Sequence, residues 1–365
     1  MKTRSGSLTY RAGGSSPFII VKIFGNSWLR FCGAAVPKIF FRESLTGGDG
    51  LKARNAEAKR GRIGITRSRG VSRNAPTQES PLNLAKRQLR LLNIRASKGL
   101  GQHFLIDRDV LEKIVEAAEL NPDDTVVEVG PGLGILTGEL AGMAGRVIAV
   151  EVDAKLASAL EKSFAQMPQV SVLNANVLEM KPGEILGRHG MTADFSGNYK
   201  VVANLPYYIA SPILRHFLEA SPKPGLMVVM VQKEVGQSIV AQPGEMSMLG
   251  VSVQLYGKPS IVDYVPAGSF YPRPKVDSAI IGIDVYPRPA VNVEDVSGFF
   301  EVVRAGFSAP RKQLRNSLGL GLQLETQVVI ELLEEAEITP QRRPQTLSLE
   351  EWAQVYRAFA GRGKR

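Results

Sequence analysis

The chain has 365 residues, of which 44% are apolar and 22% are charged, so it can bury a sizeable core and form more than one domain. Its one cysteine, Cys32, excludes an intramolecular disulfide. Three histidines and the lack of a C-x-x-C pair leave little material for a structural zinc site. We therefore expect a reducing compartment and no bound metal.

The net charge of +10 is unevenly distributed. Residues 1–80 carry 15 Lys and Arg against 4 Asp and Glu, whereas the remaining 285 residues carry 30 basic and 31 acidic side chains. The body of the chain is therefore close to neutral. A surface there that binds a polyanion must be a local patch.

Residues 1–83 are interpreted as a basic, disordered extension. From Thr46 to Ser80 the chain is rich in Gly, Arg, Ala and Ser and shows no apolar period. The more apolar stretch 17–41 is interrupted by Lys22, Arg30 and Lys38, so we predict no transmembrane helix. An organellar transit peptide is one interpretation of this arm, and an unstructured extension with a start site placed too far upstream is the other, which we favour. Mass spectrometry of the mature N-terminus distinguishes the two.

From residue 106 onward, apolar runs of strand length alternate with segments of helical period. Asp107 or Asp109 can cap a helix that continues to Leu120. Further helices are expected at about 135–143, 155–164 and 211–219, and strands at 125–129, 146–152, 170–175, 199–204 and 225–231. This alternation predicts a parallel sheet with right-handed crossovers, which is a doubly wound, Rossmann-like α/β domain.

Beyond Pro287 the pattern becomes helical only, with expected helices at 296–307, 311–318, 327–336 and 349–359. Four helices in about seventy residues are enough for a small second domain. We therefore predict an α/β domain at 84–287 and an all-α C-terminal domain at 288–365.

The first strand ends in Glu128-Val129-Gly130-Pro131-Gly132-Leu133-Gly134, and the second ends in Glu151-Val152-Asp153. Glycines between a strand and a helix allow a ligand to approach the backbone, and an acid about 20 residues on can accept from both ribose hydroxyls. The carboxylate of Glu128 would repel a pyrophosphate, whereas S-adenosylmethionine carries an amino group and a sulfonium. The loop therefore favours S-adenosylmethionine as the cofactor, although a tight turn that needs small residues is the alternative.

The tetrapeptide Asn204-Leu205-Pro206-Tyr207 follows the strand at 199–204, so it should lie beside the cofactor. The lone pair of an adenine N6 is delocalised into the ring, and N6 is a poor nucleophile. Acceptors on its hydrogens, here the Asn204 side-chain oxygen and a Leu205 or Pro206 carbonyl, favour a more tetrahedral nitrogen that can attack. Tyr207 offers a face on which an extruded base can stack. The alternative is a simple strand-to-loop turn.

Six ordered motifs resemble those of the ribosomal RNA adenine N6,N6-dimethyltransferase family, over about residues 84–359. They are K-G-L-G-Q-H-F-L-I-D (98–107), E-V-G-P-G-L-G (128–134), V-A-N-L-P-Y-Y-I (202–209), V-Q-K-E-V (231–235), F-Y-P-R-P-K-V-D-S-A (270–279) and F-S-A-P-R-K-Q-L-R-N-S-L (307–318). By this resemblance the cofactor contacts His103, Leu105, Gly130, Gly132, Glu151, Asn176 and Asn204. Phe270 would stack on the target base opposite Tyr207. The alternatives are a helix lead-in at His103 and a plain core position at Phe270.

The chain departs from the family pattern at Asn176, where the family usually has Asp. An Asp carboxylate accepts from the adenine amine of the cofactor with charge assistance, and an Asn accepts through its amide oxygen without it. From the sequence we expect Asn176→Asp to tighten cofactor binding.

The cluster Arg311, Lys312 and Arg315 resembles the R-K-x-L-R-N segment of the family and is predicted to open a helix that contacts RNA phosphates. A solvated helix face is the alternative.

The resemblance implies dimethylation of two adjacent adenosines in the 3′-terminal hairpin loop of small-subunit rRNA, within a pre-30S assembly intermediate, by a monomeric cytoplasmic enzyme that binds no membrane. A large-subunit rRNA methyltransferase and a non-catalytic ribosome-assembly or transcription factor on the same fold are the rivals. The segment at 307–316 argues against the first rival, and the set of Gly130, Glu151 and Asn204 argues against the second.

Overall fold

The computed structural model describes residues 18–23, 27–32, 80–93, 102–187 and 199–362. The chain forms two compact units, Met1–Arg73 and Asn74–Arg365. In the described part of the chain, no helix is long and apolar enough to cross a membrane.

In the first unit, two strands pair in antiparallel register. Strand β1 (Phe18–Ile23) pairs with β2 (Ser27–Cys32), with Phe18 opposite Cys32. These two strands lie within the extension at 1–83, whose overall disorder stays a prediction. Both are rich in β-branched and aromatic residues, which favour a strand once a partner is present. The predicted disorder of 46–79 lies outside the described residues.

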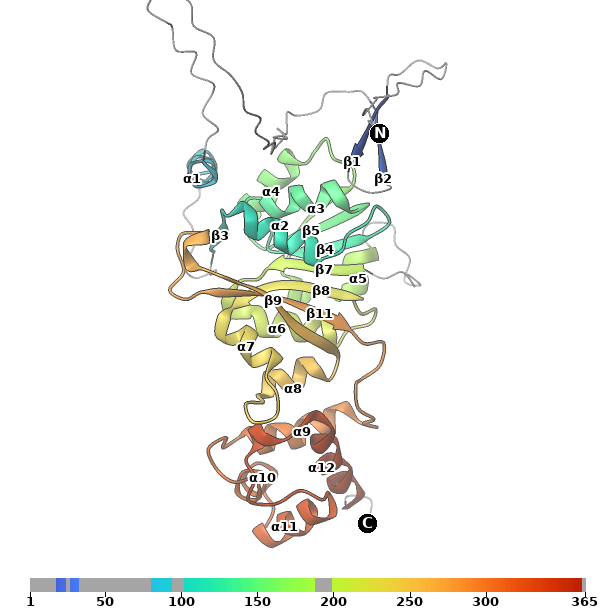
Figure 1. The fold of residues 1–365 in the computed structure, drawn as a ribbon, viewed down its shortest axis with the longest axis vertical. Helices are drawn as coiled ribbons and strands as arrows, with labels where there is room; N and C mark the ends of the chain where they lie inside the picture. The colour runs from blue at the N-terminus through green and yellow to red at the C-terminus, as the bar shows by residue number, and fades with distance from the viewer. Residues whose placement is uncertain (1–17, 24–26, 33–79, 94–101, 188–198, 363–365) are drawn as a thin grey trace, which may run out of the picture. The chain divides into compact units, whose positions relative to one another are not determined.

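A seven-stranded sheet forms the centre of the second unit (Figure 1). Its spatial order is β6 (Val170–Asn174), β5 (Arg146–Glu151), β4 (Thr125–Val129), β7 (Tyr199–Asn204), β8 (Leu226–Gln232), β11 (Ser278–Val285) and β9 (Gly257–Val265). The strands from β6 to β8 pair in parallel, as the sequence predicts, and the doubly wound α/β class is confirmed. The direction of winding changes between β4 and β7, which is where such sheets bind ligands.

Every residue of β4 is buried, because helices cover both faces of the sheet. Val126 packs on one face with residues of α2 (Arg108–Ala117) and α3 (Ile135–Met143). Val127 packs on the other face with residues of α6 (Ala210–Leu218) and α5 (Pro182–Gly187). Helix α4 (Ala154–Ser163) contacts β5 and β6. Asp107 caps α2, as one of the two predicted capping residues.

The sequence did not indicate the antiparallel end of the sheet. Strand β11 pairs antiparallel with both β8 and β9, and helices α7 (Lys233–Val240) and α8 (Met248–Gln254) come between β8 and β9 in the chain. Strand β9 lies at the sheet edge, and between its two buried end residues it alternates exposed and half-buried residues. The antiparallel strands therefore add a half-solvated edge to a parallel sheet that is buried on both faces.

A second, two-stranded sheet brings distant segments together. Strand β3 (Phe104–Leu105) pairs antiparallel with β10 (Phe270–Tyr271), with Leu105 opposite Phe270. Helix α1 (Pro81–Leu91) packs here, since Leu89 shares a small core with Phe104 and Leu156. The pairing places the segment before α2 beside the segment after β9.

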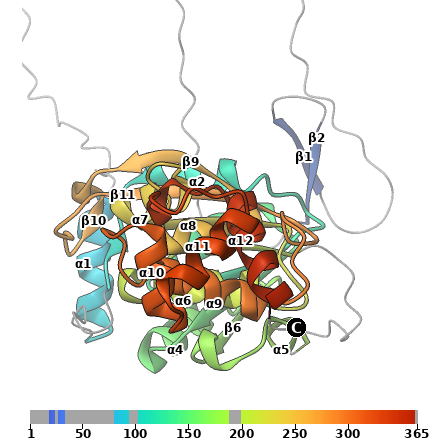
Figure 2. The same cartoon turned by 90° about the horizontal axis from the view of Figure 1, so that it is seen from below.

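The C-terminal helices pack together below the sheet in Figure 1 and overlap in Figure 2. They are α9 (Val296–Phe307), α10 (Leu314–Leu322), α11 (Thr326–Glu335) and α12 (Leu349–Arg362). Trp352 is fully buried, and its ring lies so close to Gly306 that a Cβ there would overlap it. The apolar core of these helices is continuous with the α6 side of the sheet. The domain boundary at 287/288 stays a prediction.

Candidate functional site

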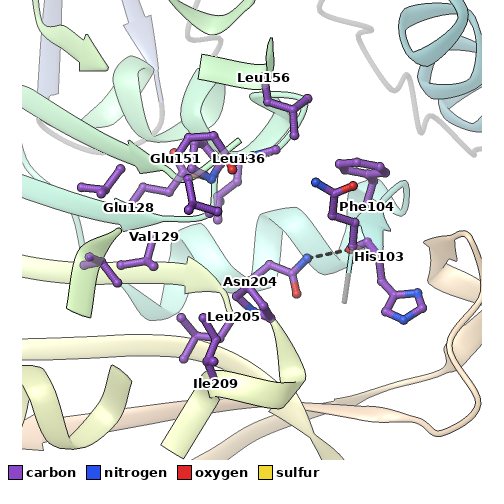
Figure 3. Close-up of a pocket in the computed structure, with 18 of the residues that line it drawn as sticks. His103, Phe104, Glu128, Val129, Leu136, Glu151, Leu156, Asn204, Leu205 and Ile209 are labelled. Atoms are coloured by element: carbon purple, nitrogen blue, oxygen red, sulfur yellow. Dashed lines mark hydrogen bonds between the residues drawn. The ribbon is translucent and has the colours of Figure 1, made fainter. Parts of the chain in front are cut away.

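A cavity of about 290 Å³ lies at the carboxyl ends of β4, β5 and β7, beside the change of winding direction. Figure 3 shows the side chains that surround it. Every residue predicted to bind the cofactor lines this cavity, together with the remaining residues of the tetrapeptide at 204–207. Phe270 and the basic cluster do not. Topology therefore brings residues from 103 to 207 into one site.

Three glycines of the loop adopt a backbone conformation that would be strained for any other residue. Gly130, Gly132 and Gly134 have φ of +67°, +59° and +77°, in the left-handed region. A Cβ at Gly132 would lie 3.0 Å from the Phe104 ring, and one at Gly134 would lie 2.6 Å from Leu160. The glycines are therefore required both by the turn and by the close packing around it.

Glu128 is buried in the cavity wall with an exposure of 1%, and its Oε2 atom has no hydrogen-bond partner in the described residues. Burial raises the pKa of Glu128 to about 8. At neutral pH the side chain is thus mainly protonated. The negative charge that we expected to repel a pyrophosphate is therefore largely absent. A buried carboxyl with one unpartnered oxygen instead suits a ligand that brings a positive charge or a hydrogen-bond donor, as the amino group of S-adenosylmethionine does.

Glu151 is held at the end of β5 by two backbone N–H groups. Its Oε2 accepts from Gly132 at 3.1 Å, and its Oε1 accepts from Asp153 at 2.9 Å. Burial raises the pKa of this carboxyl, and the two backbone bonds act in the opposite direction. Each carboxylate oxygen can accept a second bond, so the side chain is oriented and still able to accept from a pair of hydroxyls.

Asn176 follows β6 and forms the N-cap of a short 3-10 helix, η1 (Val177–Glu179). Its Oδ1 accepts from the backbone N–H of Leu178 at 3.2 Å, and its Nδ2 donates to Oε1 of Glu179 at 2.8 Å. The amide therefore reaches the cavity with one acceptor position of its oxygen still available.

Asn204 ends β7, and its Nδ2 donates to the backbone carbonyl of His103 at 3.0 Å (Figure 3). Since the NH₂ group is used by this carbonyl, the orientation of the amide is fixed and its Oδ1 can serve as an acceptor. The adjacent Leu205 is buried, and its N–H donates to the carbonyl of Met230 at 3.1 Å. Pro206 lies against Gly130. The start of the tetrapeptide is thus rigidly attached to the sheet.

Tyr207 and His103 form an aromatic pair with ring centroids 5.6 Å apart and an interplanar angle of 25°. The Tyr207 hydroxyl and the Ser278 Oγ are 2.6 Å apart, and burial raises the pKa of the phenol. The Nδ1 of His103 lies 2.7 Å from the carbonyl of Pro272, so Nδ1 carries the hydrogen. Three separate segments therefore hold the aromatic side of the cavity in place.

Phe270 is placed differently from the sequence-based expectation. It is 3% exposed and packs in the core with Leu105, Val265 and Ile280. In this conformation it offers no face to a base in the cavity, because strand β10 turns its side chain toward the core. The stacking of Phe270 on the target base therefore stays a prediction, and so does the alternative of a plain core position.

Some residues that line the cavity were not predicted from the sequence. Tyr208 lines the cavity and is 56% exposed, and Val152 lines it and is 54% exposed. Both directly follow a predicted site residue, so their aromatic or apolar character beside Tyr207 and Glu151 was the available signal. Such exposed apolar surface inside a cavity is suited to the flat face of a purine.

The basic cluster lies in the C-terminal helices. Arg311 and Lys312 are exposed in the turn before α10, and Arg315 is the second residue of that helix, so the prediction that the cluster opens the helix is wrong by three residues. The turn forms because Lys312 N–H donates to the Ala309 carbonyl and Leu314 N–H donates to the Arg342 carbonyl. The latter bond also brings the loop with exposed Arg343 against the start of α10.

Comparison with known proteins gives consistent results. Residues 93–355 match the family model described as "Ribosomal RNA adenine dimethylase". The chain is 51% identical over 268 residues to "Ribosomal RNA small subunit methyltransferase A" of Dehalococcoides mccartyi, which covers 73% of this chain and 90% of the relative. It is 45% identical to the protein of that name from Moorella thermoacetica, which covers 72% of this chain and 92% of the relative.

Two solved structures resemble this one. A dimethyladenosine transferase from Plasmodium falciparum superposes with a TM-score of 0.60 at 23% identity, over 72% of this chain and 98% of that one. The 23S rRNA methyltransferase ErmE superposes with a TM-score of 0.54 at 28% identity, over 70% of this chain and 99% of that one. The first supports the fold alone, and the second adds a modest similarity of sequence.

Proposed function

Because the chain belongs to the ribosomal RNA adenine dimethylase family, we propose that it methylates N6 of two adjacent adenosines, twice each, in the 3′-terminal hairpin loop of small-subunit rRNA. Membership of the family makes it an S-adenosylmethionine-dependent rRNA adenine dimethyltransferase. The small subunit is supported by the names of the relatives at 51% and 45% identity. A pre-30S intermediate as the bound form, a monomeric enzyme and a cytoplasmic location complete the proposal.

The cavity fits this cofactor. Glu128 offers an unpartnered buried carboxyl oxygen, and Gly130 and Gly132 line the cavity with backbone that carries no side chain. Glu151 would accept from the ribose hydroxyls, Asn176 from the adenine amine, and Val152 would contact the adenine face. His103 and Leu105 would contribute the opposite wall. When bound, S-adenosylmethionine supplies an electrophilic methyl group on a sulfonium.

The hydrogen bond from Asn204 Nδ2 to the His103 carbonyl carries the catalytic proposal. It leaves the Asn204 oxygen to accept one N6 hydrogen of the target adenine, and the carbonyl of Leu205 or Pro206 to accept the other. Holding both hydrogens localises the nitrogen lone pair and aligns the amine for in-line attack. Catalysis then needs a positioned amine and no covalent intermediate with the protein.

Tyr207 would stack on the extruded base. Its hydroxyl is tied to Ser278, so the ring is oriented before the RNA arrives. Stacking on an aromatic ring stabilises an unstacked base by about 1–3 kcal/mol, which offsets part of the cost of extrusion. His103 covers one face of Tyr207, so the base would use the other face or displace the imidazole.

RNA outside the cavity would contact Arg311, Lys312 and Arg315. These cations are positioned to bind phosphates and not to read bases, since each offers charge without a surrounding pocket. Arg343 on the adjoining loop would extend the same basic surface.

Substitution of Asn204 tests the catalytic role directly. Asn204→Ala removes the acceptor for N6 and should lower methyl transfer by at least about 10²-fold, while RNA binding stays within about twofold. Transfer is measured with radiolabelled cofactor, and RNA binding by filter retention. Asn292→Ala, an exposed asparagine outside the cavity, is the matched control. Retained turnover in Asn204→Ala would refute the assigned role.

Primer extension identifies the substrate. Dimethylated adenosine blocks Watson–Crick pairing, so rRNA from a deletion strain should lose a pair of adjacent stops near the 3′ end of the small-subunit rRNA. Loss of a stop in large-subunit rRNA would support the ErmE-like alternative. An unchanged pattern in both rRNAs would favour a non-catalytic assembly or transcription factor.

A further inference from the structure

The side chains of Asn176 and Glu179 form a pair at the edge of the cavity. Asn176 lines the cavity, and its Nδ2 donates to Glu179 Oε1 at 2.8 Å. Glu179 is exposed and does not line the cavity. The hydrogen bond to Asn176 is therefore the contact that links Glu179 to the cavity.

The two hydrogen bonds of Asn176 allow only one orientation of its amide. The Oδ1 atom accepts from Leu178 N–H at 3.2 Å, and the carboxylate of Glu179 can only accept. In the flipped orientation, the NH₂ group would face the N–H of Leu178 and the oxygen would face the carboxylate. Both contacts would then be repulsive, so Glu179 fixes the oxygen as the group that the cavity can use.

We propose that Glu179 is a positioning residue for the adenine of the cofactor, which orients the Asn176 amide and strengthens its oxygen as an acceptor. A hydrogen bond from an amide N–H to a carboxylate is charge-assisted, and it polarises the amide so that electron density on the oxygen increases. The neutral side chain at 176 thus gains part of the acceptor strength of a carboxylate. This inference rests on the proposed function, in which the adenine amine meets Asn176.

The pair also changes the effect expected for Asn176→Asp. A carboxylate at 176 would face that of Glu179 at the distance now spanned by a hydrogen bond, and like charges this close repel. The gain predicted from the sequence alone should therefore be lost in the single variant. It should appear only when Glu179→Gln is added, because the Gln amide can donate to the new carboxylate.

Calorimetry with S-adenosylhomocysteine tests the inference in the full chain. Glu179→Gln should weaken binding roughly threefold to tenfold, and Asn176→Asp should stay within about twofold of the parent. The double variant should bind more tightly than either single variant. The inference is overturned if Glu179→Gln binds like the parent, or if Asn176→Asp alone binds as tightly as the double variant. Glu161→Gln, an exposed acid on α4, is the matched control.

A second ligand separates positioning from a general structural effect. S-inosylhomocysteine has a carbonyl in place of the adenine amine, so the group at that position offers no hydrogen to Asn176 Oδ1. Its affinity should be the same, within about twofold, in the parent and in Glu179→Gln. If Glu179→Gln weakens both ligands equally, Glu179 supports the loop only and the inference fails.

Asn176→Ala distinguishes failure of the inference from failure of the proposed site. If this variant binds S-adenosylhomocysteine like the parent, the adenine does not meet Asn176, and the cofactor assignment fails together with the inference. If it binds more weakly while Glu179→Gln does not, the site is supported and only the role of Glu179 is overturned.

Discussion

The polar residues of the cavity and the basic residues before α10 are held in opposite ways. Glu151 accepts from two backbone N–H groups, and Asn204 donates to a backbone carbonyl. Arg311 and Lys312 are exposed, and their side chains form no hydrogen bond or ion pair with the described residues. The cavity is therefore built before its ligand arrives, whereas the cluster can adapt to a flexible backbone. Substitutions in the two regions should differ in size and in their dependence on salt.

The largest effect is expected from Gly134→Ala, which should break the prebuilt loop. The residue has φ of +77°, and its new Cβ would lie 2.6 Å from Leu160. Strain and overpacking together should lower the free energy of unfolding by about 2–4 kcal/mol, and cofactor affinity should fall with it. Chemical denaturation and calorimetry measure both quantities.

Gly138→Ala in α3, the helix that Gly134 precedes, is the control, because a Cβ there meets nothing within 4 Å. It should leave cofactor binding unchanged and raise stability by about 0.5–1 kcal/mol. Equal behaviour of the two variants would show that the loop is not conformationally constrained.

Glu128→Gln should give an intermediate effect that depends on pH. The folded pKa of about 8 lies above the ordinary value of 4.5, so between these pH values the unfolded chain binds fewer protons than the folded chain. The free energy of unfolding should then fall as pH rises from about 5 to 8, by at most about 1.4 kcal/mol per pH unit for this group. The variant should lose this slope. Denaturation at several pH values checks it, with exposed Glu139→Gln as the control that keeps the parent slope.

The smallest effects are expected in the cluster. Replacing Arg311, Lys312 or Arg315 singly by Ala should weaken RNA binding about twofold to fivefold and leave cofactor affinity unchanged. Each loss should also reduce the slope of log affinity against log salt by roughly 0.7–0.9. Exposed Lys258→Ala on β9 is the control, and an unchanged salt slope in all three variants would remove the cluster from the RNA interface.

Sequence reasoning located the cavity because its signals are local. Strands at 125–129 and 199–204 are confirmed at the residues predicted, and the loop at Gly130 and the turn at Asn204 follow them directly. In a parallel sheet, such strand ends meet at one edge, so chain order alone brings them together.

The features that were missed depend on contacts between distant segments. Strands β9 and β11 carry patterns that become interpretable only when their antiparallel partners are known. Phe270 could not be assigned to the core or the cavity, because its orientation is set by pairing with β3. Likewise, the hydrogen bond between Asn176 and Glu179 depends on how the two side chains are oriented, which the sequence does not specify although both residues lie in one short segment. Helix α10 begins three residues later than predicted, because its first N–H groups donate to carbonyls of the loop at 340–342, far along the chain.

The partner that aims Asn204 is a main-chain oxygen, and this has a consequence for how position 103 should be studied. Any amino acid there offers the same carbonyl, so the imidazole itself takes no part in this hydrogen bond. An alanine scan would report the contribution of the imidazole and miss the more important atom. An amide-to-ester replacement between residues 103 and 104, which weakens that oxygen as an acceptor, would expose its contribution.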